Sequence, residues 1–414
     1  MEDAVAGVPG RKSTVLLLTD GVPNEVPEGG HHLALSAYKD AAPDCFRFQV
    51  NTLGFGITLD SDLLTDIATL GDGTFAFIPD SKIMGTVFVN CLANVIATAT
   101  QQATLSLTTP TTPDGSADAT IVGRPLGDYS CSAESWGLRV DLGPLQYGQT
   151  RSIAVPMAIP SLATTEKRAA AAAEAQMGEA PPPYLEAKLE FTRPDSTEVC
   201  VVARPSPIPQ TVPSANAVLT ALRCDVITTG RLAVAAADAG DMDVAHTTIA
   251  GLIERFAPAG AETKDNESAH AALLLLQSDV EGRLSKALSR KERFERWGKH
   301  YLRALLRAHQ LQVQTNFMDP GLKSYGGALF EKVRDAGGLI FAALPAPQPP
   351  PKTCPICGDA FGLDCTTAEM QRHTESHFGG PPAPAAPVRS TRVVRAQARA
   401  PDMADFYQGE GGGC

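Results

Sequence analysis

Two cysteines and two histidines in one short stretch constrain the folding of this 414-residue chain more than any other feature of its sequence. Two residues separate Cys354 from Cys357, and three separate His373 from His377, after a gap of fifteen residues. Two thiolates and two imidazoles at such spacings are the ligands of a tetrahedral structural zinc site. A C-x-x-C turn points both sulfur atoms inward, and histidines at positions i and i+4 share one face of a helix. The sequence therefore predicts that Cys354, Cys357, His373 and His377 bind one Zn²⁺.

A helix around the histidines is predicted independently of the metal. Thr366 and Glu369 fit a capping box, in which each side chain binds the backbone N–H of the other residue. Phe361 and Met370 are among the few large apolar side chains available to pack beneath the ion. So small a core needs the metal in order to fold, and binding contributes on the order of 10 to 16 kcal/mol in comparable peptides. Cys365 has no partner at metal spacing and is predicted not to be a ligand.

The fifteen-residue gap sets this stretch apart from DNA-reading fingers, which usually have about twelve residues between the ligand pairs and occur in tandem. The C-P-I-C start, Phe361 and the H-x-x-x-H-F ending resemble the ubiquitin-binding zinc fingers of autophagy adaptor proteins such as the calcium-binding and coiled-coil family. Met370 departs from that pattern, because those fingers tend to carry an aromatic residue there. The resemblance implies a small ββα finger at residues 354–378 that binds ubiquitin.

Charge and cysteine usage restrict the class of protein. A net charge of −11 disfavours nucleic acid as a partner, because sequence-independent affinity comes from lysine and arginine side chains that neutralise phosphates. The nine cysteines are scattered apart from the C-x-x-C pair and form no disulfide framework, and a zinc thiolate site needs a reducing compartment. We expect no export signal, and the sequence contains no run of about 18 apolar residues. We expect an intracellular, cytoplasmic protein with no membrane contact, with the nucleus as the alternative location.

Residues 1–102 alternate short apolar runs with amphipathic segments. This alternation indicates a parallel sheet covered by helices on both faces. Gly54 and Gly56 also fit a dinucleotide-binding loop, but the third glycine of that motif is missing and no helix follows at once. The predicted strands are 13–18, 48–53 and 74–78, and the predicted helices are 33–40, 60–70 and 82–98.

The strings VLLLTDGVPN, NTLGFG and GDGTFAFIPD in this region resemble the second half of a von Willebrand factor A (VWA) domain. The resemblance implies a Rossmann-like sheet in which Asp20 belongs to a divalent-metal site, yet the D-x-S-x-S loop that supplies the family's other ligands is absent. One aspartate cannot give Mg²⁺ near-octahedral oxygen coordination, so we expect Asp20 to be a turn residue. The resemblance also implies a sheet edge that lacks its first strands, which a partner protein or the missing N-terminal half would cover.

Two further regions follow along the chain. Residues 103–205 contain short β-rich runs separated by turn residues, which predicts an antiparallel β-sandwich. One of these runs is residues 152–157. Residues 213–345 are predicted to be helical, with a first helix that Ser214 caps and Gly230 breaks.

The strongest predicted helix covers residues 292–312. Trp297, Tyr301 and Leu305 repeat at four-residue spacing and form a buried apolar stripe. The opposite face is basic. We interpret it as a solvated face, with a phosphate-binding stripe as the alternative; its residues are Arg296, Lys299, Arg303 and Arg307.

The string WGKHYLRALLRAHQLQVQTNF, with DPGLKSYGG after it, resembles the Vwaint domain, a helical module that follows VWA domains in VWA-Hint (hedgehog/intein) proteins. Residues 346–353 are predicted to be a Pro-rich linker and residues 379–414 a disordered tail. The tail from Met403 onwards looks like the junction at which a Hint domain would begin. The resemblance implies that such a domain would attack the preceding peptide bond with its first cysteine, here Cys414.

These observations predict a multidomain α/β, β and α protein: a partial VWA-like parallel sheet, a β-sandwich, a helical Vwaint-like module and a ββα finger. No G-x-S-x-G, H-E-x-x-H or phosphate loop occurs in the sequence. We therefore expect no enzyme but a zinc-binding interaction or adaptor protein whose finger binds a protein partner such as ubiquitin. The alternatives are a truncated VWA-Hint autoprocessing precursor and a DNA-binding finger protein.

Overall fold

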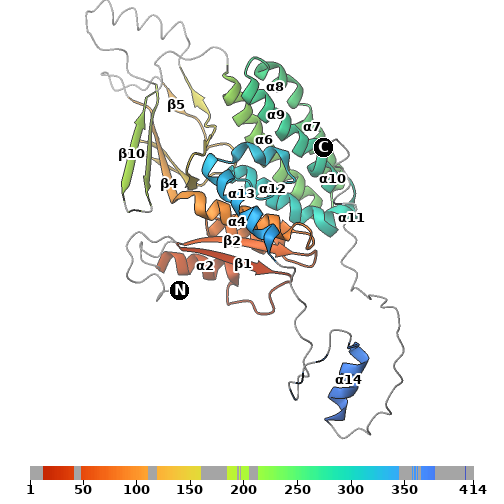
Figure 1. Ribbon diagram of the computed structural model, residues 1–414. Helices are drawn as coiled ribbons and strands as arrows, with labels where there is room; N and C mark the ends of the chain where they lie inside the picture. The colour runs from red at the N-terminus through yellow and green to blue at the C-terminus, as the bar shows by residue number, and fades with distance from the viewer. Residues whose placement is uncertain are drawn as a thin grey trace, which may run out of the picture. The chain divides into compact units, whose positions relative to one another are not determined.

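The computed structural model describes most of the chain, which falls into two compact units (Figure 1). The first unit comprises Met1–Leu339 and Pro401–Cys414, and the second comprises Ile340–Ala400. No helix within the described residues combines the length and apolar composition needed to cross a bilayer. The described residues are 13–41, 48–110, 119–159, 184–193, 195, 197–204, 213–344, 357, 359, 361, 365–377 and 406.

The N-terminal region alternates strands and helices, as predicted, and forms a parallel sheet of order β1-β2-β3. The strands are β1 (Ser13–Thr19), β2 (Phe48–Phe55) and β3 (Phe75–Ile78). The helices are α2 (Gly30–Ala41), α3 (Ser61–Leu70) and α4 (Met84–Ala97). Asp60 caps α3 by accepting a hydrogen bond from the Leu63 N–H at 3.0 Å, as Asp or Ser at this position favours.

Strand β1 lies at one edge of this sheet. It pairs in parallel with β2 from Ser13 opposite Phe48 to Thr19 opposite Gly54. Three successive leucines of β1 are exposed to 40%, 36% and 50%: Leu16, Leu17 and Leu18. Parallel strands are normally buried on both faces, and β2 follows that rule from Gln49 to Gly54. Among the described residues, β1 is therefore an open apolar edge.

The middle of the chain is antiparallel, as the sequence predicts. Strand β4 (Thr98–Thr108) continues directly from α4 and pairs with both β7 and β9. The five-stranded sheet has the order β10-β9-β4-β7-β6, with β6 (Cys131–Glu134), β7 (Gly137–Gln146), β9 (Glu186–Thr192) and β10 (Glu198–Ala203). A separate two-stranded ribbon joins β5 (Thr120–Ile121) to β8 (Met157–Ala158).

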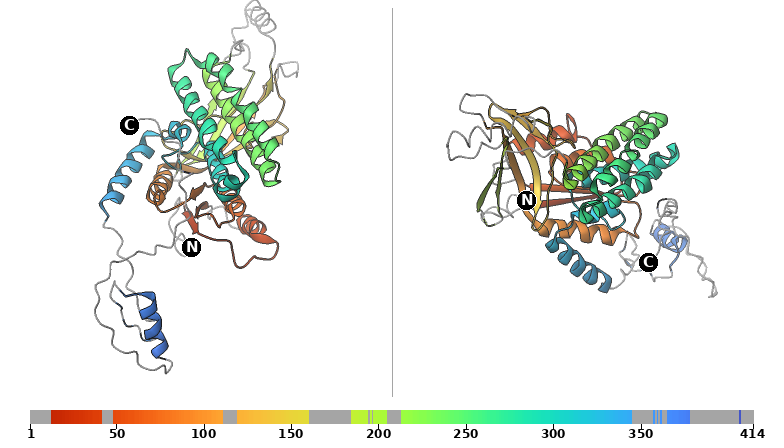
Figure 2. Two further views of the ribbon diagram at one scale, coloured as in Figure 1. Left: turned by 90° about the vertical axis from the view of Figure 1, so that its right-hand side faces the viewer. Right: turned by 90° about the horizontal axis from the view of Figure 1, so that it is seen from above.

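Four helices of the C-terminal half pack side by side (Figures 1 and 2): α6 (Ala215–Asp238), α7 (Met242–Ile253), α8 (Phe256–Thr263) and α9 (Glu267–Asp279). The predicted break at Gly230 is wrong, because α6 runs through it. A Cβ atom at Gly230 would lie 2.6 Å from Leu306 Cδ2. The glycine thus permits a close helix contact, and the packing compensates for its poor helix propensity.

The predicted strongest helix is a chain of shorter helical turns that ends in α12 (Lys299–Leu311). Trp297, Tyr301 and Leu305 are buried, as the apolar stripe predicts. Gln312 closes α12 in the left-handed conformation at φ 51°. The other elements are two π-helical turns, η2 (Val280–Leu284) and η3 (Phe294–Gly298), the helices α10 (Ser285–Leu288), α11 (Lys291–Arg293) and α13 (Ala328–Ala343), and the 3-10 turn η4 (Pro320–Tyr325).

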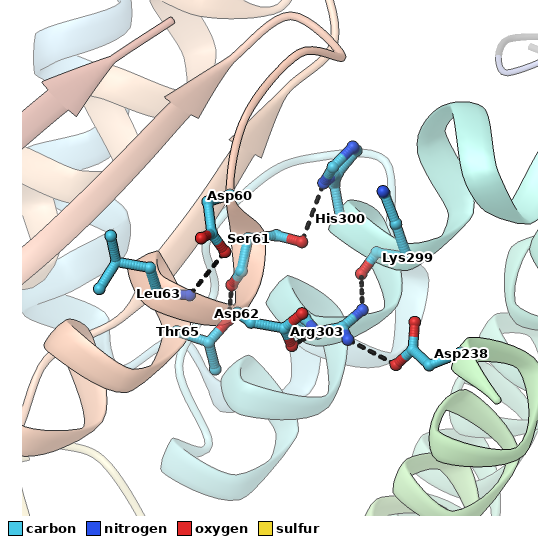
Figure 3. Close-up of polar contacts among 9 residues, drawn as sticks. All are labelled: Asp60, Ser61, Asp62, Leu63, Thr65, Asp238, Lys299, His300 and Arg303. Carbon is cyan, nitrogen blue, oxygen red and sulfur yellow. Dashed lines mark hydrogen bonds and ion pairs between the residues drawn. The ribbon is translucent and has the colours of Figure 1, made fainter. Parts of the chain in front are cut away.

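Two residues of the predicted basic face, Arg303 and Arg307, are not solvated, which corrects that part of the interpretation of the sequence. Figure 3 shows Arg303 between two carboxylates, with its Nε 2.5 Å from Asp62 Oδ1 and its Nη2 2.6 Å from Asp238 Oδ2. Arg307 is only 6% exposed and donates from Nε to the Gly73 carbonyl at 3.0 Å. Two of the four basic residues therefore join α12 to the parallel sheet region and to α6. The sequence pattern shows a polar face but not the neighbours that cover it.

Glutamines at the end of α12 connect the helical region to the antiparallel region. Gln310 Nε2 donates to the carbonyls of Gly127 at 3.1 Å and Asp128 at 2.8 Å. The Gln312 amide accepts from the Ser152 N–H at 3.0 Å and donates to the Ser152 carbonyl at 2.8 Å. The strand predicted at 152–157 is largely absent, since only β8 at Met157–Ala158 overlaps it. At Ser152 a side chain of the helical region, not another strand, binds the backbone.

His300 is the buried titratable group at the contact between α12 and α3. Its Nδ1 lies 2.9 Å from Ser61 Oγ, and its side chain is fully buried. Figure 3 draws this contact as a dashed line. Burial disfavours the imidazolium and, with the charge of Lys299, lowers the pKa of His300 from its usual 6.5 to about 4. The folded protein thus holds this histidine neutral at pH 7.

We expect acid to weaken the fold through His300. Because its pKa is lower in the folded chain than in the unfolded one, its stabilising contribution is complete above pH 6.5 and is lost as the pH falls through 4. The free energy of unfolding of the wild type should therefore fall more steeply than that of His300→Asn between pH 6.5 and 4, by up to about 1.4 kcal/mol per pH unit. Urea unfolding followed by circular dichroism measures both slopes. His32→Asn, at an exposed position, is the control, and equal slopes for wild type and His300→Asn would contradict this assignment.

Candidate metal centre

The second unit contains the helix that was predicted around the histidines, α14 (Thr367–Ser376). Its capping box is confirmed: the Thr366 N–H donates to Glu369 Oε2 at 2.7 Å, and the Glu369 N–H donates to Thr366 Oγ1 at 3.2 Å. These reciprocal bonds satisfy two backbone donors that the first turn of a helix leaves without partners. The box fixes where the helix begins, and thereby the face on which the histidines lie.

Three of the four predicted ligands meet at one point. His373 Nε2 lies 3.2 Å from His377 Nε2 and 3.3 Å from Cys357 Sγ. All three donor atoms lie within 4.8 Å of one another. The Phe361 ring stands edge-on to the His373 ring, with 5.0 Å between the centroids, which is the packing role predicted for Phe361. The fourth predicted ligand, Cys354, lies outside the described residues.

Two of the three donor separations are close to those of a tetrahedral zinc ion, and the third, between Cys357 and His377, is at most 4.8 Å. With Zn–N bonds of about 2.0–2.1 Å and a Zn–S bond of about 2.3 Å, tetrahedral ligands lie roughly 3.4 Å apart for N and N and roughly 3.6 Å apart for N and S. The separations of 3.2 Å and 3.3 Å are within about 0.3 Å of those values. A thiolate with two imidazoles suits Zn²⁺ better than it suits Mg²⁺ or Ca²⁺, which prefer oxygen ligands.

The remaining sequence candidates lie apart from this group. Cys365 is outside the three-residue cluster, and its Sγ lies 3.7 Å from the Thr366 carbonyl oxygen. Asp20 is exposed in the bend that follows β1, where its backbone carbonyl accepts from Thr58 Oγ1 at 3.4 Å. Cys414 lies outside the described residues. Among the described residues, Cys357, His373 and His377 are the one group whose side chains converge as metal ligands.

Sequence reasoning missed a second polar cluster, which is buried in the helical region. His309 Nε2 lies 3.2 Å from Asp279 Oδ2, and Tyr301 Oη donates to Asp319 Oδ1 at 2.6 Å. Burial, with the nearby charge of Asp279, raises the pKa of Asp319. These side chains are at most 4% exposed, and each polar group has a partner inside the helical region. The sequence signal was available, since His309 continues the 297–301–305 stripe by four residues where an apolar side chain was due.

The architecture defines the class of the chain as a mixed α/β protein with a parallel sheet, an antiparallel sheet and a helical region. Residues 270–337 match the family model Vwaint, described as "VWA / Hh protein intein-like". This confirms, for that stretch, the resemblance carried by the WGKHYLRALL string and the residues after it. The match covers less than half of the chain.

Three solved structures are similar to parts of this chain, two of them named as von Willebrand factor A (VWA) proteins. A von Willebrand factor type A protein from Catenulispora acidiphila matches at 15% identity and a TM-score of 0.39, over 63% of this chain and 57% of that one. The ArnB paralog VWA2 from Sulfolobus acidocaldarius matches at 12% identity and a TM-score of 0.33, over 72% of this chain and 64% of that one. The human COPII-coat protein Sec24c matches at 12% identity and a TM-score of 0.37, over 75% of this chain and 41% of that one. The chain thus spans less than two thirds of each structure, and the curated proteins include no match to it.

We expect the capping box to support metal binding. Replacing Thr366 by alanine removes the side chain that caps α14, which costs about 1 kcal/mol. Because both histidines need the helix, the affinity for Co²⁺ should fall about fivefold, as measured from the visible absorption of the bound ion. Gln371→Ala, at an exposed position of the same helix, is the matched control. An unchanged affinity in Thr366→Ala would show that the ligands do not depend on this cap.

Proposed function

We propose that residues 354–378 form a C2H2 finger that binds one Zn²⁺ through Cys354, Cys357, His373 and His377, and that the protein acts by binding another protein rather than by catalysis. The observation that supports this most directly is the convergence of three donor atoms within 4.8 Å. The ion would supply no chemistry to a substrate: its four ligands close the coordination shell, and its binding free energy would stabilise the finger. Thiolate ligation requires a reducing, intracellular setting, for which we propose the cytoplasm.

Zinc content tests the ligand set. The wild-type chain should bind one equivalent, and Cys354→Ser, Cys357→Ser and His377→Ala should each lose the zinc, because three ligands hold the ion far less tightly than four. Cys365→Ser is the matched control and should keep one equivalent. Removing the metal with a chelator should unfold α14 and leave the fluorescence of Trp297 unchanged, since that side chain is buried in the first unit. Full zinc content in Cys357→Ser would refute the assignment.

A protein surface, with ubiquitin as the foremost candidate, suits the exposed face of α14 better than DNA does. Exposed positions on and next to this helix are small or polar: Ala368, Glu369, Gln371 and Arg372. Glu369 is held in the capping box, and a carboxylate there opposes a phosphate backbone. One arginine neutralises too few phosphates for a single finger to hold a DNA site, and the net charge of −11 adds to the repulsion. A short helix offers a small contact area, so we expect a dissociation constant of roughly micromolar or weaker.

Titration of the zinc-loaded full chain distinguishes the two kinds of partner. Labelled ubiquitin should give saturable shifts that Ala368→Arg weakens, because a long charged side chain would stand on the contact surface. Random duplex DNA at physiological salt should give none. Saturable binding of DNA together with no response to ubiquitin would reverse this ranking and favour the DNA-binding finger.

The exposed edge strand β1 of the parallel sheet is a second candidate binding site for a partner protein. Leu16, Leu17 and Leu18 are exposed along β1, and unpaired edge strands are templates for a further strand. We propose that a partner protein, or the N-terminal half of a VWA domain, covers this edge.

The alternative function is that of an autoprocessing precursor of the VWA-Hint kind. The Vwaint match at residues 270–337 favours it, because the description of that family names a hedgehog and intein-like protein. In this alternative Cys414 would be the cysteine that attacks the preceding peptide bond, by analogy with Hint domains.

A further inference from the structure

One side chain from beyond the second unit lies inside the first. Phe406 is 2% exposed, and three aromatic rings surround it. Its centroid lies 5.0 Å from that of Trp297, 5.7 Å from Tyr301 and 6.3 Å from Phe77, and each pair meets edge to face. Edge-to-face packing at such distances is the favoured arrangement of aromatic pairs. Phe406 thus occupies an aromatic pocket.

The pocket is built for an aromatic ring rather than for any apolar side chain. The Arg283 guanidinium carbon stands 5.0 Å from the Phe406 centroid, over the ring, in the geometry of a cation–π contact. Apolar side chains, among them Val87 and Leu305, form part of the remaining walls. Polar residues complete the lining: Thr315, Asn316 and Asp319. The space that remains beside the ring is about 10 Å³, at or below what one water molecule needs. The ring therefore fills the pocket.

The walls of the pocket come from parts of the chain that precede Ile340–Ala400. Phe77 comes from β3, Trp297 from η3 and Tyr301 from α12, all within Met1–Leu339. Trp297 and Tyr301 contact each other at 5.9 Å, and α12 is held on β3 and α3 by its own packing and by Arg303 and Arg307. Phe406, by contrast, reaches the pocket only after the chain has passed through Ile340–Ala400. Phe406 is therefore joined to the walls of its pocket through the intervening segment Ile340–Ala400, as a tethered ligand is joined to its site.

We propose that this pocket is a binding site for a phenylalanine side chain carried on a short segment, and that Phe406 occupies it in cis as a releasable latch. The latch would return the chain to the first unit after Ile340–Ala400, so that the segment with the metal centre forms a loop anchored at both ends. A tethered ligand sees its site at a high effective concentration, so a contact too weak to persist between separate molecules persists within one. This inference is independent of the proposed zinc site.

The chain carries a reporter for the latch. It has two tryptophans: Trp136 is 42% exposed, whereas Trp297 is fully buried against Phe406. In the Trp136→Phe chain, all tryptophan fluorescence therefore comes from the pocket. Adding Phe406→Ala should shift the emission to longer wavelength, because water enters where the ring lay. The matched control is Phe317→Ala, which removes a ring that is 45% exposed.

A peptide in trans then tests whether the pocket is a binding site. The probe is a labelled peptide of residues 401–411, PDMADFYQGEG, and the control peptide has alanine in place of its phenylalanine. The probe should bind the full-length Phe406→Ala chain saturably and restore its tryptophan emission. It should bind the wild type at least about tenfold more weakly, because the tethered ring competes. The control peptide should bind neither chain.

Four results would overturn the proposal. Probe binding that is equal in both chains, or absent from both, would show that the pocket is not a site that Phe406 blocks. A Phe406→Ala chain destabilised as much as Leu302→Ala, whose side chain is fully buried in the same core, would make Phe406 an ordinary core residue. A wild-type dimer that Phe406→Ala dissociates, detected by light scattering, would show that the ring occupies the pocket of a second copy.

Discussion

Buried polar side chains of α12 hold this helix in place by hydrogen bonds to neighbouring elements. The arrangement of the first unit depends on these bonds. Burial lowers the pKa of Arg307 to about 10, so the guanidinium is charged at pH 7 and needs acceptors in the interior. It finds them in the Gly73 carbonyl and in the Gln310 side chain, 2.8 Å from its Nη1. Gln310 in turn binds the backbone of the antiparallel region. One short polar network thus joins the parallel sheet, the helices and the antiparallel strands.

The two compact units rely on different forces. The first unit has a large apolar core in which Trp297, Leu302 and Phe256 are almost fully buried, so the hydrophobic effect dominates its stability. The second unit contains the candidate metal centre, where His373 is only half-buried and Cys357 and His377 are exposed. A segment with so little apolar burial needs another source of free energy, and metal coordination is of the required size. Loss of the ion and loss of the core are therefore separable events.

The polar groups of the helical region show how a buried cluster differs from a site for a ligand. His309, Asp279 and Asp319 pair among themselves or with tyrosines, and they are at most 2% exposed. In the Phe406 pocket, by contrast, the occupant arrives from a distant segment of the chain.

The sequence by itself determined what depends on local spacing. The capping box of α14, the cap at Asp60, the alternation that gives the parallel sheet and the buried stripe of Trp297 follow from side-chain periods and short-range hydrogen bonds, which neighbouring residues decide. The convergence of Cys357, His373 and His377 belongs here too, because a turn and one helical repeat are enough to bring them together.

Only the tertiary structure decided what depends on contacts between distant segments. The pattern of α12 showed a basic face, but the carboxylates of Asp62 and Asp238 that cover it come from other helices. Gly230 looked like a helix break because its propensity is poor, and Leu306 packing against it reverses that expectation. Residues 152–157 had the composition of a strand, yet the Gln312 side chain hydrogen-bonds both the N–H and the carbonyl of Ser152. Phe406 carried no local signal at all, since its partners precede it by more than a hundred residues. Secondary-structure propensity depends on a few neighbouring residues, whereas the burial of a side chain depends on which distant segments pack against it.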